Sequence, residues 1–274
     1  MLTLGQFMSK EKNRQSWDIL SKLYQSEHII SLEDVHYGPH APGERNLGLI
    51  GNVSDLDVLE IGCGGGQNSI VLMKWGARSV IGIDQSDAQL RHAKKLAQKE
   101  KANVRFLRAD MEDLHVFGNS TFDLVVSSHA LDYAENLDRV FQETARVLRN
   151  GGRFVFCMLN PIWRVVGTAL ECDDLAKVQA YFGQETEKWS WTTSDGQSIG
   201  EFETAPWRFE QILNGVIHSG LRVETVAEPR GYSADEIRKI DVQSIPYRDS
   251  KPSEKFLELI QRIPFSIIIS AKKS

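Results

Sequence analysis

Hydrophobic runs and helical patterns alternate along most of this chain. Continuous hydrophobic runs predict strands that are covered on both faces, at 58–61, 79–83, 104–107, 122–127, 153–159, 221–227 and 266–271. Between several of these runs, apolar residues recur every three or four positions, which predicts helices. This alternation is typical of an α/β fold. We therefore expect a doubly wound, seven-stranded sheet with helices on both faces.

An additional segment precedes the first predicted strand. Trp17, Leu20, Leu23 and Tyr24 lie at helical spacing and predict an amphipathic helix over about 13–24. A turn-rich stretch and a short helix over 44–50 then lead into the sheet. The chain is therefore divided into an N-terminal helical arm, residues 1–51, and a main domain, residues 52–274.

The pattern breaks after the fifth predicted strand. Aromatic residues are scattered between 160 and 205 among Gly, Ser, Thr and Asp with no single period. An insertion of this length in a compact domain is usually functional, so we expect a cap at about 160–206. A helix follows from Trp207 to Gly220, and a charged loop is expected over 229–264.

Composition narrows the classes of function. The chain has 274 residues, of which 41% are hydrophobic, and its formal net charge is −5. An acidic balance argues against binding to a phosphate backbone. Three sparse cysteines form no metal-ligand pattern and suit a reducing compartment. Because neither a signal peptide nor a long apolar run is present, we expect a cytoplasmic location and no membrane association.

The stretch from Asp57 to Gly66, DVLEIGCGGG, joins a buried strand to a glycine-rich turn. Such a turn before a helix lets a polar ligand lie against main-chain N–H groups. The dinucleotide fingerprint requires a sixth-position glycine, but Gln67 stands there, and no Gly-Lys-Ser/Thr triplet follows for a P-loop. Asp84 ends the second strand 18 residues after Gly66, close to the roughly 20 expected for a ribose-binding acid.

Five motifs occur in order along the chain: LEIGCGGG, IGIDQS, RADMEDL, FDLVVSSHAL and ARVLRNGGRFVF. Together they resemble class I S-adenosylmethionine-dependent methyltransferases, of the small-molecule branch that includes ubiquinone-biosynthesis-like enzymes. The resemblance covers about 58–159 and extends more loosely to the C-terminus. It implies a Rossmann-like methyltransferase sheet, S-adenosylmethionine as the cofactor and S-adenosylhomocysteine as the product. It also implies that the N-terminal arm acts as a lid.

The resemblance assigns a role to several residues. Glu60 would polarise the methionine end of the cofactor, Asp84 would bind the ribose hydroxyls, and Asp110 would hold the adenine amine. The other cofactor contacts expected are Gly62, Cys63, Gly64, Gln85, Met111 and Ser127, with Cys63 as a small loop filler. Tyr37 is expected either to reach over the cofactor or to pack at a hinge.

His129 is the candidate catalytic residue. It follows the fourth strand, at the sheet edge where open α/β folds bind ligands, and imidazole titrates in the range that suits a general base. The alternative is that His129 packs on the adenosine or caps the next helix. Tyr24, His28 and Trp207 are candidate substrate contacts, or else parts of the core or cap.

The sequence leaves several classes of methyl acceptor open. Adenine-N6 methyltransferases of this fold carry Asn/Asp-Pro-Pro-aromatic after the fourth strand, where this chain has Ser127-Ser128-His129-Ala130. Cytosine-C5 methyltransferases use a cysteine that follows a proline, and none of the three cysteines of this chain does so. A small-molecule acceptor with a hydrophobic or aromatic portion is therefore favoured, and no nucleic-acid partner is expected. An RNA or protein methyltransferase and a non-catalytic cofactor- or nucleotide-binding protein of the same fold remain the alternatives.

Overall fold

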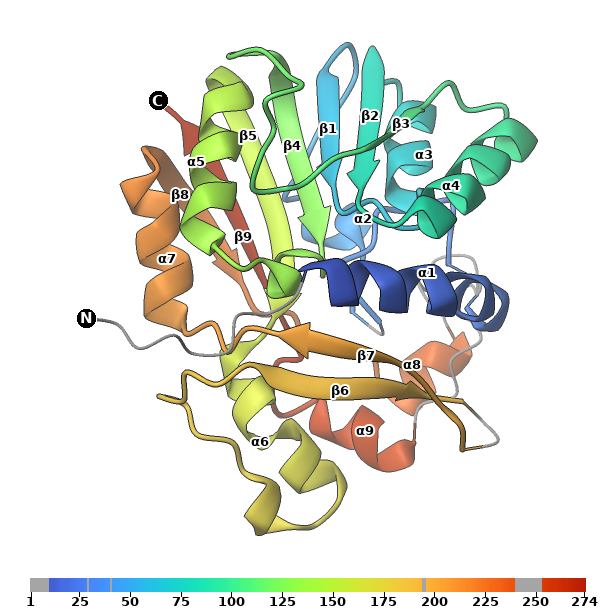
Figure 1. Ribbon diagram of the computed structural model, residues 1–274, viewed down its shortest axis with the longest axis vertical. Helices are drawn as coiled ribbons and strands as arrows, with labels where there is room; N and C mark the ends of the chain where they lie inside the picture. The colour runs from blue at the N-terminus through green and yellow to red at the C-terminus, as the bar shows by residue number, and fades with distance from the viewer. Residues whose placement is uncertain (1–9, 29, 40, 194–195, 240–252) are drawn as a thin grey trace.

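The computed structural model describes residues 10–28, 30–39, 41–193, 196–239 and 253–274. A seven-stranded sheet forms its centre (Figure 1). Its strands are β1 (Asp57–Ile61), β2 (Ser79–Asp84), β3 (Arg105–Arg108), β4 (Phe122–Ser128), β5 (Leu148–Leu159), β8 (Leu221–Ala227) and β9 (Ser266–Lys273). The helices are α1 (Lys10–Glu27), α2 (Glu44–Leu47), α3 (Gln67–Lys74), α4 (Asp87–Glu100), α5 (Leu137–Val147), α6 (Pro161–Glu171), α7 (Phe209–His218), α8 (Ala234–Lys239) and α9 (Glu254–Leu259). No helix in these described ranges is long and apolar enough to cross a bilayer.

The strand order is β3-β2-β1-β4-β5-β9-β8. The first five strands run parallel, and β9 pairs antiparallel with both β5 and β8. The predicted doubly wound, seven-stranded sheet is confirmed. The chain moves outward from β1 to β3 and then resumes at β4 on the other side of β1. Ligands of open α/β sheets bind at such a switch point, beyond the carboxyl ends of the strands.

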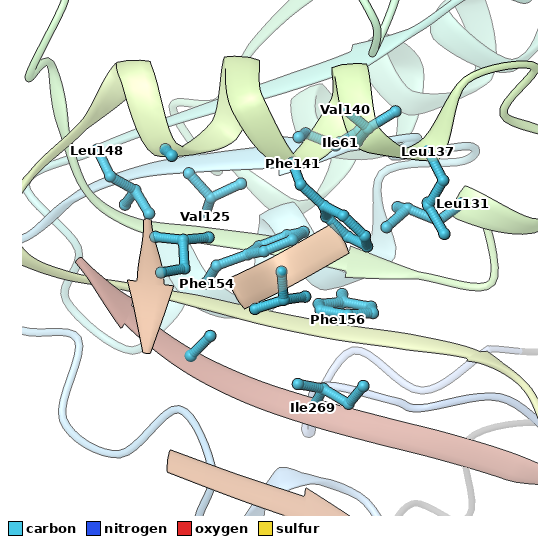
Figure 2. Close-up of a cluster of buried hydrophobic side chains, with 14 of the residues drawn as sticks. Ile61, Val125, Leu131, Leu137, Val140, Phe141, Leu148, Phe154, Phe156 and Ile269 are labelled. Atoms are coloured by element: carbon cyan, nitrogen blue, oxygen red, sulfur yellow. The ribbon is translucent and has the colours of Figure 1, made fainter. Parts of the chain in front are cut away.

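Both faces of the sheet are buried. On one face, the rings of Phe154 and Phe156 stack with centroids 4.7 Å apart, and Phe141 of α5 packs 5.4 Å from Phe156 (Figure 2). The residues that alternate with them, such as Val155, join a second cluster on the opposite face. Successive strand side chains point to opposite faces, so continuous hydrophobic runs are what this sheet requires.

The segment after β5 is more regular than its sequence pattern suggested. It contains α6, a short 3₁₀ turn η2 (Leu175–Lys177), and a hairpin of β6 (Glu187–Thr192) and β7 (Ser198–Thr204). The side chain of Asn160 caps α6 by accepting a hydrogen bond from the N–H of Ile162, at 2.9 Å. Pro161 then occupies the first turn, where its missing N–H has no cost.

The expected charged loop over 229–264 was wrong for the part that the structure describes. Both α8 and α9 form there, while residues 240–252 lie outside the described ranges. Leu257 and Ile260 pack against Trp163 of α6, and Phe256 lies 5.5 Å from the ring of Trp163. The cap is therefore built from two separate insertions, one after β5 and one after β8.

Helix α1 lies across the arrowhead ends of the parallel strands, with β7 on its other side (Figure 1). Its contact with β7 combines hydrogen bonds with packing of the Trp17 ring 5.1 Å from that of Phe202. The amide of Asn13 donates to the carbonyl of Glu203 and accepts from its N–H, both at 2.8 Å. On the sheet side, Asp18 accepts hydrogen bonds from Ser86 Oγ at 2.7 Å and from Ala88 N at 3.0 Å. The arm helix thus joins the sheet to the cap.

Phe156→Ala should lower the free energy of unfolding by about 3–5 kcal/mol, because it leaves a cavity among fully buried rings. Urea denaturation followed by circular dichroism measures this loss. Val116→Ala, at a site that is 53% exposed, is the control and should change stability by less than about 0.5 kcal/mol. A loss at Phe156 no larger than at Val116 would contradict the core described above.

Candidate active site

A cavity of about 1140 Å³ opens at the carboxyl ends of β1, β2 and β4. The glycine loop and the segment after β4 line one side of it, and α1, β6 and α6 line the others. Ligand pockets commonly measure about 300–1,000 Å³, so this space can hold two molecules the size of a nucleoside and a small metabolite. It lies at the switch point of the strand order.

Glycines in the loop after β1 allow two close approaches. Gly62 has φ +66°, and a Cβ placed there would lie 2.1 Å from the Cβ of Ala130, after β4. A Cβ on Gly65 would lie 2.4 Å from the side-chain nitrogen of Gln25 in α1. The loop is therefore in direct contact with the segment after β4 on one side and with the arm helix on the other.

Asp84 binds the glycine loop from the end of β2. Its Oδ2 accepts the N–H of Gly64 at 2.9 Å, and its Oδ1 accepts the N–H of Ser86 at 2.8 Å. Burial raises the pKa of this carboxyl. The N–H of Gln85 also hydrogen-bonds to this carboxylate, and Asp84 lines the cavity. Since a carboxylate has about four lone-pair sites, Asp84 can still accept a hydrogen bond from a ligand hydroxyl.

Glu60 is a buried carboxyl that lines the cavity. It is only 3% exposed, and the hydroxyl of Ser69 in α3 donates to its Oε2. Burial raises the pKa of Glu60 to about 7. A cationic group in the cavity would favour the charged form of this carboxyl, so Glu60 is suited to hold an ammonium group.

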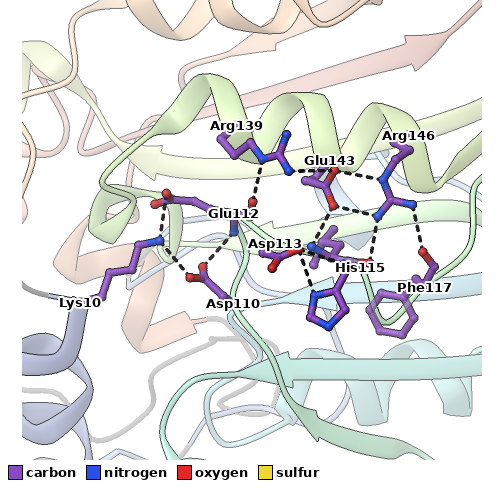
Figure 3. Close-up of polar contacts among 10 residues, drawn as sticks. Lys10, Asp110, Glu112, Asp113, His115, Phe117, Arg139, Glu143 and Arg146 are labelled. Atoms are coloured by element: carbon purple, nitrogen blue, oxygen red, sulfur yellow. Dashed lines mark hydrogen bonds and ion pairs between the residues drawn. The ribbon is translucent and has the colours of Figure 1, made fainter.

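The acidic loop after β3 carries Asp110 and Met111, which both line the cavity. Lys10 of α1 places its ammonium 2.9 Å from Asp110 Oδ2 and 2.9 Å from Glu112 Oε2 (Figure 3). Arg139 and other residues of α5 tie this loop to the sheet, Arg139 Nε donating to the carbonyl of Glu112 at 3.2 Å. The adenine-binding candidate Asp110 is therefore already in contact with the arm helix.

Two of the expected cofactor contacts lie elsewhere. The phenol of Tyr37 is 2% exposed and donates to Glu44 Oε2 at 2.6 Å. The hydroxyl of Ser127 donates to the carbonyl of Ile61 at 2.9 Å inside the sheet. The cavity is lined instead by their neighbours His36 and Ser128. In both cases the backbone turns the predicted side chain inward, so these two expectations are corrected.

His129 lies at the end of β4 with a positive φ of 50°. Its Nε2 is 3.0 Å from Ser266 Oγ and 3.4 Å from Cys157 Sγ, and its Nδ1 is 3.9 Å from Asp132 Oδ2. Burial lowers the pKa of the imidazole to about 4, so the ring is neutral near pH 7. Asp132 also lines the cavity. The sequence analysis did not identify Asp132 as a site residue. Its position three residues after His129, near the end of the fourth strand, could have indicated it.

A cluster of aromatic side chains also lines the cavity. Tyr24 and His28 contact each other with ring centroids 4.7 Å apart, and Trp191 of β6 lies 5.5 Å from Tyr24 and 5.4 Å from His28. These three residues and Trp207 all line the cavity. The expected substrate contacts Tyr24, His28 and Trp207 are thus brought to one cavity with Glu60 and Asp84. Cys63, Gly64 and Gln85 line the same space.

Comparison with known proteins agrees with this geometry. Residues 59–156 match a family model described as a methyltransferase domain. The matched segment runs from β1 into β5, includes the glycine loop, Asp84 and Asp110, and is similar to a methyltransferase domain. An uncharacterized methyltransferase, YbaJ of Bacillus subtilis, is 32% identical over 127 residues, which are 46% of this chain and 49% of that protein. The chain thus spans about half the length of that relative.

Two further similarities extend over more of this chain. A malonyl-[acyl-carrier protein] O-methyltransferase of Paenibacillus is 28% identical and aligns with 76% of this chain and 75% of its own length. The crystal structure of an S-adenosylmethionine-dependent methyltransferase from Mesorhizobium loti superposes with a TM-score of 0.59 at 22% identity, over 83% of this chain and 95% of that one. The latter similarity confirms the fold.

S-adenosylmethionine is the cofactor that the sequence motifs imply, and the residues around the cavity fit it. A Cβ added to Gly64 meets no atom within 4 Å, so the loop backbone is open to a ligand. Asp84 places a carboxylate in the cavity where ribose hydroxyls are expected, and Glu60 offers a buried carboxyl for an ammonium. When bound, the cofactor supplies an electrophilic methyl group on a cationic sulfur.

Asp84→Ala should weaken binding of S-adenosylhomocysteine by about 100-fold or more, because it removes a charged acceptor for a ribose hydroxyl. It also releases the N–H of Gly64. Titration calorimetry measures the affinity. Asp87→Ala is the matched control, since that exposed carboxylate pairs only with exposed Arg108 at 3.2 Å. Undiminished affinity in the Asp84 variant would refute the ribose assignment.

Glu60→Gln should stabilise the cofactor-free protein at pH 8 and have a much smaller effect at pH 5. The folded state raises the pKa of Glu60 to about 7, so its contribution to stability is lost as the pH rises from the unfolded pKa, about 4.3, to about 7. Gln cannot ionise, and it also cannot neutralise an ammonium, so cofactor affinity should fall. Thermal melts at both pH values and calorimetry test this, with exposed Glu258→Gln as control. Equal melting shifts at the two pH values would count against the buried-acid assignment.

Proposed function

We propose that this protein transfers a methyl group from S-adenosylmethionine to a small-molecule metabolite that has a hydrophobic or aromatic portion. The single observation that carries this proposal is the continuity of one cavity. The same cavity is lined by Glu60 and Asp84 and by Tyr24, His28 and Trp191. A donor and an apolar acceptor can therefore meet within one cavity.

The chemistry suits such an enclosure. Methyl transfer from a sulfonium is a displacement in line with the breaking bond, so the protein must position the acceptor and keep water out. We assign the role of lid to the arm, residues 1–51, because α1 covers the cavity between the sheet and β7. The cap at about 160–206 then supplies the walls around the acceptor.

The charges in the cavity favour a small molecule over a nucleic acid. Its described lining includes four cationic side chains, Lys10, Arg14, Arg164 and Lys188, and seven acidic ones, Glu60, Asp84, Asp110, Glu112, Asp132, Glu185 and Glu187. A nucleic-acid groove requires an excess of positive charge to neutralise phosphates. The Paenibacillus relative is named as an O-methyltransferase of malonyl-[acyl-carrier protein], which supports transfer of the methyl group to an oxygen atom.

A panel assay tests the proposal. The protein is incubated with S-adenosylmethionine and either 2-naphthol, 2-naphthoic acid, 2-(aminomethyl)naphthalene, mixed transfer RNA or a protein extract. Mass spectrometry then measures S-adenosylhomocysteine. We expect product with at least one naphthalene probe and none above background with RNA or protein. Methylation of RNA or protein in preference to every probe would overturn the small-molecule assignment.

Trp191→Ala should raise the KM of the accepted probe by about 10-fold, because one buried aromatic contact is lost, with little change in cofactor affinity. Trp75→Ala is the matched control, since that ring lies beside Arg45 and away from the cavity. An unchanged KM in the Trp191 variant would remove the aromatic cluster from the acceptor site.

A further inference from the structure

We propose that the acceptor is a hydroxyl group, that Asp132 binds it and takes its proton, and that His129 acts by positioning Asp132. This inference rests on the proposed function and deepens it by naming the class of acceptor and the residue that it meets. It also changes the role expected for His129, from a general base that accepts the proton to a residue that positions Asp132.

Asp132 is held firmly at the reaction end of the cavity. It lies in a 3₁₀ turn, η1 (Leu131–Tyr133), directly after β4. Its carboxylate accepts the N–H of Leu159 at the end of β5, at 3.2 and 3.4 Å. Its carbonyl accepts the N–H of Ala205 at 3.2 Å. The side chain is 16% exposed and lines the cavity, so the carboxyl is fixed by the backbone yet open to a ligand.

The Nε2 edge of the His129 ring, on the side away from Asp132, already has protein contacts. Nε2 contacts Ser266 and Cys157, and a Cβ on Gly38 would lie 2.4 Å from the same nitrogen. The arm segment therefore covers that edge, and Nδ1 is the atom on the side of Asp132. The N–H of His129 donates to the carbonyl of Cys157 at 2.9 Å and fixes the unusual backbone conformation. With its pKa lowered to about 4, the imidazole is a weak proton acceptor.

The groups around Asp132 favour a neutral acceptor. Four side chains face its carboxyl group: His129 at the end of β4, Tyr133 in η1, Cys157 of β5 and Glu187 of β6. Arg164 of α6 pairs with Glu187 at 2.8 Å rather than with Asp132. Burial raises the pKa of Asp132 to about 7. A carboxylate acceptor would be repelled by Asp132 and Glu187, whereas a hydroxyl brings no charge into this buried site.

The step balances with these residues alone. A lone pair of the acceptor oxygen forms the new O–CH₃ bond while the S–CH₃ bond breaks, and the electrons of that bond neutralise the sulfonium. The hydroxyl proton passes to the carboxylate of Asp132, which later releases it to solvent. A base works best when its pKa lies near the working pH, and Asp132 meets that condition. Tyr133 and Trp207 line the cavity beside it, so a hydroxyl on an aromatic ring, a phenol, is the acceptor class.

Binding tests the hydroxyl site without turnover. Calorimetry at pH 8 compares 2-naphthol with 2-methoxynaphthalene on the S-adenosylhomocysteine complex. Asp132→Asn should weaken the binding of 2-naphthol by about 5- to 10-fold, because a charged hydrogen-bond acceptor becomes neutral. The affinity for 2-methoxynaphthalene should stay unchanged. The exposed Asp138→Asn should affect neither probe. Equal effects of Asp132→Asn on both probes would overturn the inference.

Kinetics with 2-naphthol test the proton transfer. In the wild type, kcat should rise with pH through about 7, because only the carboxylate form of Asp132 accepts a proton. Asp132→Asn should lower kcat by about 100-fold and abolish that rise. His129→Asn, whose residue type tolerates positive φ, should shift the midpoint of the pH profile while leaving the KM for S-adenosylmethionine unchanged. A lower kcat with an unshifted midpoint would reduce His129 to a structural role and remove that part of the inference.

The two proposals fail in different ways. If the wild type binds S-adenosylhomocysteine but methylates none of the naphthalene probes, the proposed function is refuted, and the binding comparison still decides the role of Asp132. If 2-naphthol is methylated and Asp132→Asn keeps at least half of kcat with the same pH profile, only the inference fails. If 2-naphthoic acid or 2-(aminomethyl)naphthalene is methylated faster than 2-naphthol, the acceptor is a carboxylate or an amine, and the assignment of a hydroxyl acceptor is refuted.

Discussion

The close approach of Gly62 to Ala130 is the constraint on which the site depends. It brings the turn after β1, which faces the cofactor end of the cavity, into contact with the segment after β4, which carries His129 and Asp132. A single methyl group at position 62 would push these two segments apart. Because β1 and β4 are neighbours at the switch point of the sheet, this contact sets the distance between the donor and acceptor ends of the cavity.

Hydrogen bonds and apolar packing together attach α1 to the rest of the protein. Asn13 and Ser16 of α1 are buried and bind the backbone of β7, while Asp18 caps the start of α4. The ring of Trp17 also packs 5.1 Å from that of Phe202 in β7, and Leu20 is fully buried. The arm helix is therefore an integral part of the fold on both of its sides.

The sequence predicted the sheet well because its central strands are covered on both faces and carry continuous apolar runs. The positions of Glu60 and Asp84 followed from strand ends. Ser127 was misplaced because adjacent strand residues face opposite ways, so the cavity received Ser128 instead. Helix α9 was missed because its six residues are too few to show a clear helical period. Asp132 lies in a single 3₁₀ turn, which has no period to detect.

The ion pairs of Lys10 with Asp110 and Glu112 have a thermodynamic consequence. We propose that Asp110 binds the adenine amine of the cofactor, so α1 and the cofactor would share one carboxylate, and the affinity of one for Asp110 would be linked to the presence of the other. Linkage of this kind is reciprocal: if occupancy of the adenine site loosens α1, then docking of α1 must weaken the adenine site by the same factor. On that assignment, docking of the arm and exchange of product for fresh cofactor would be coupled.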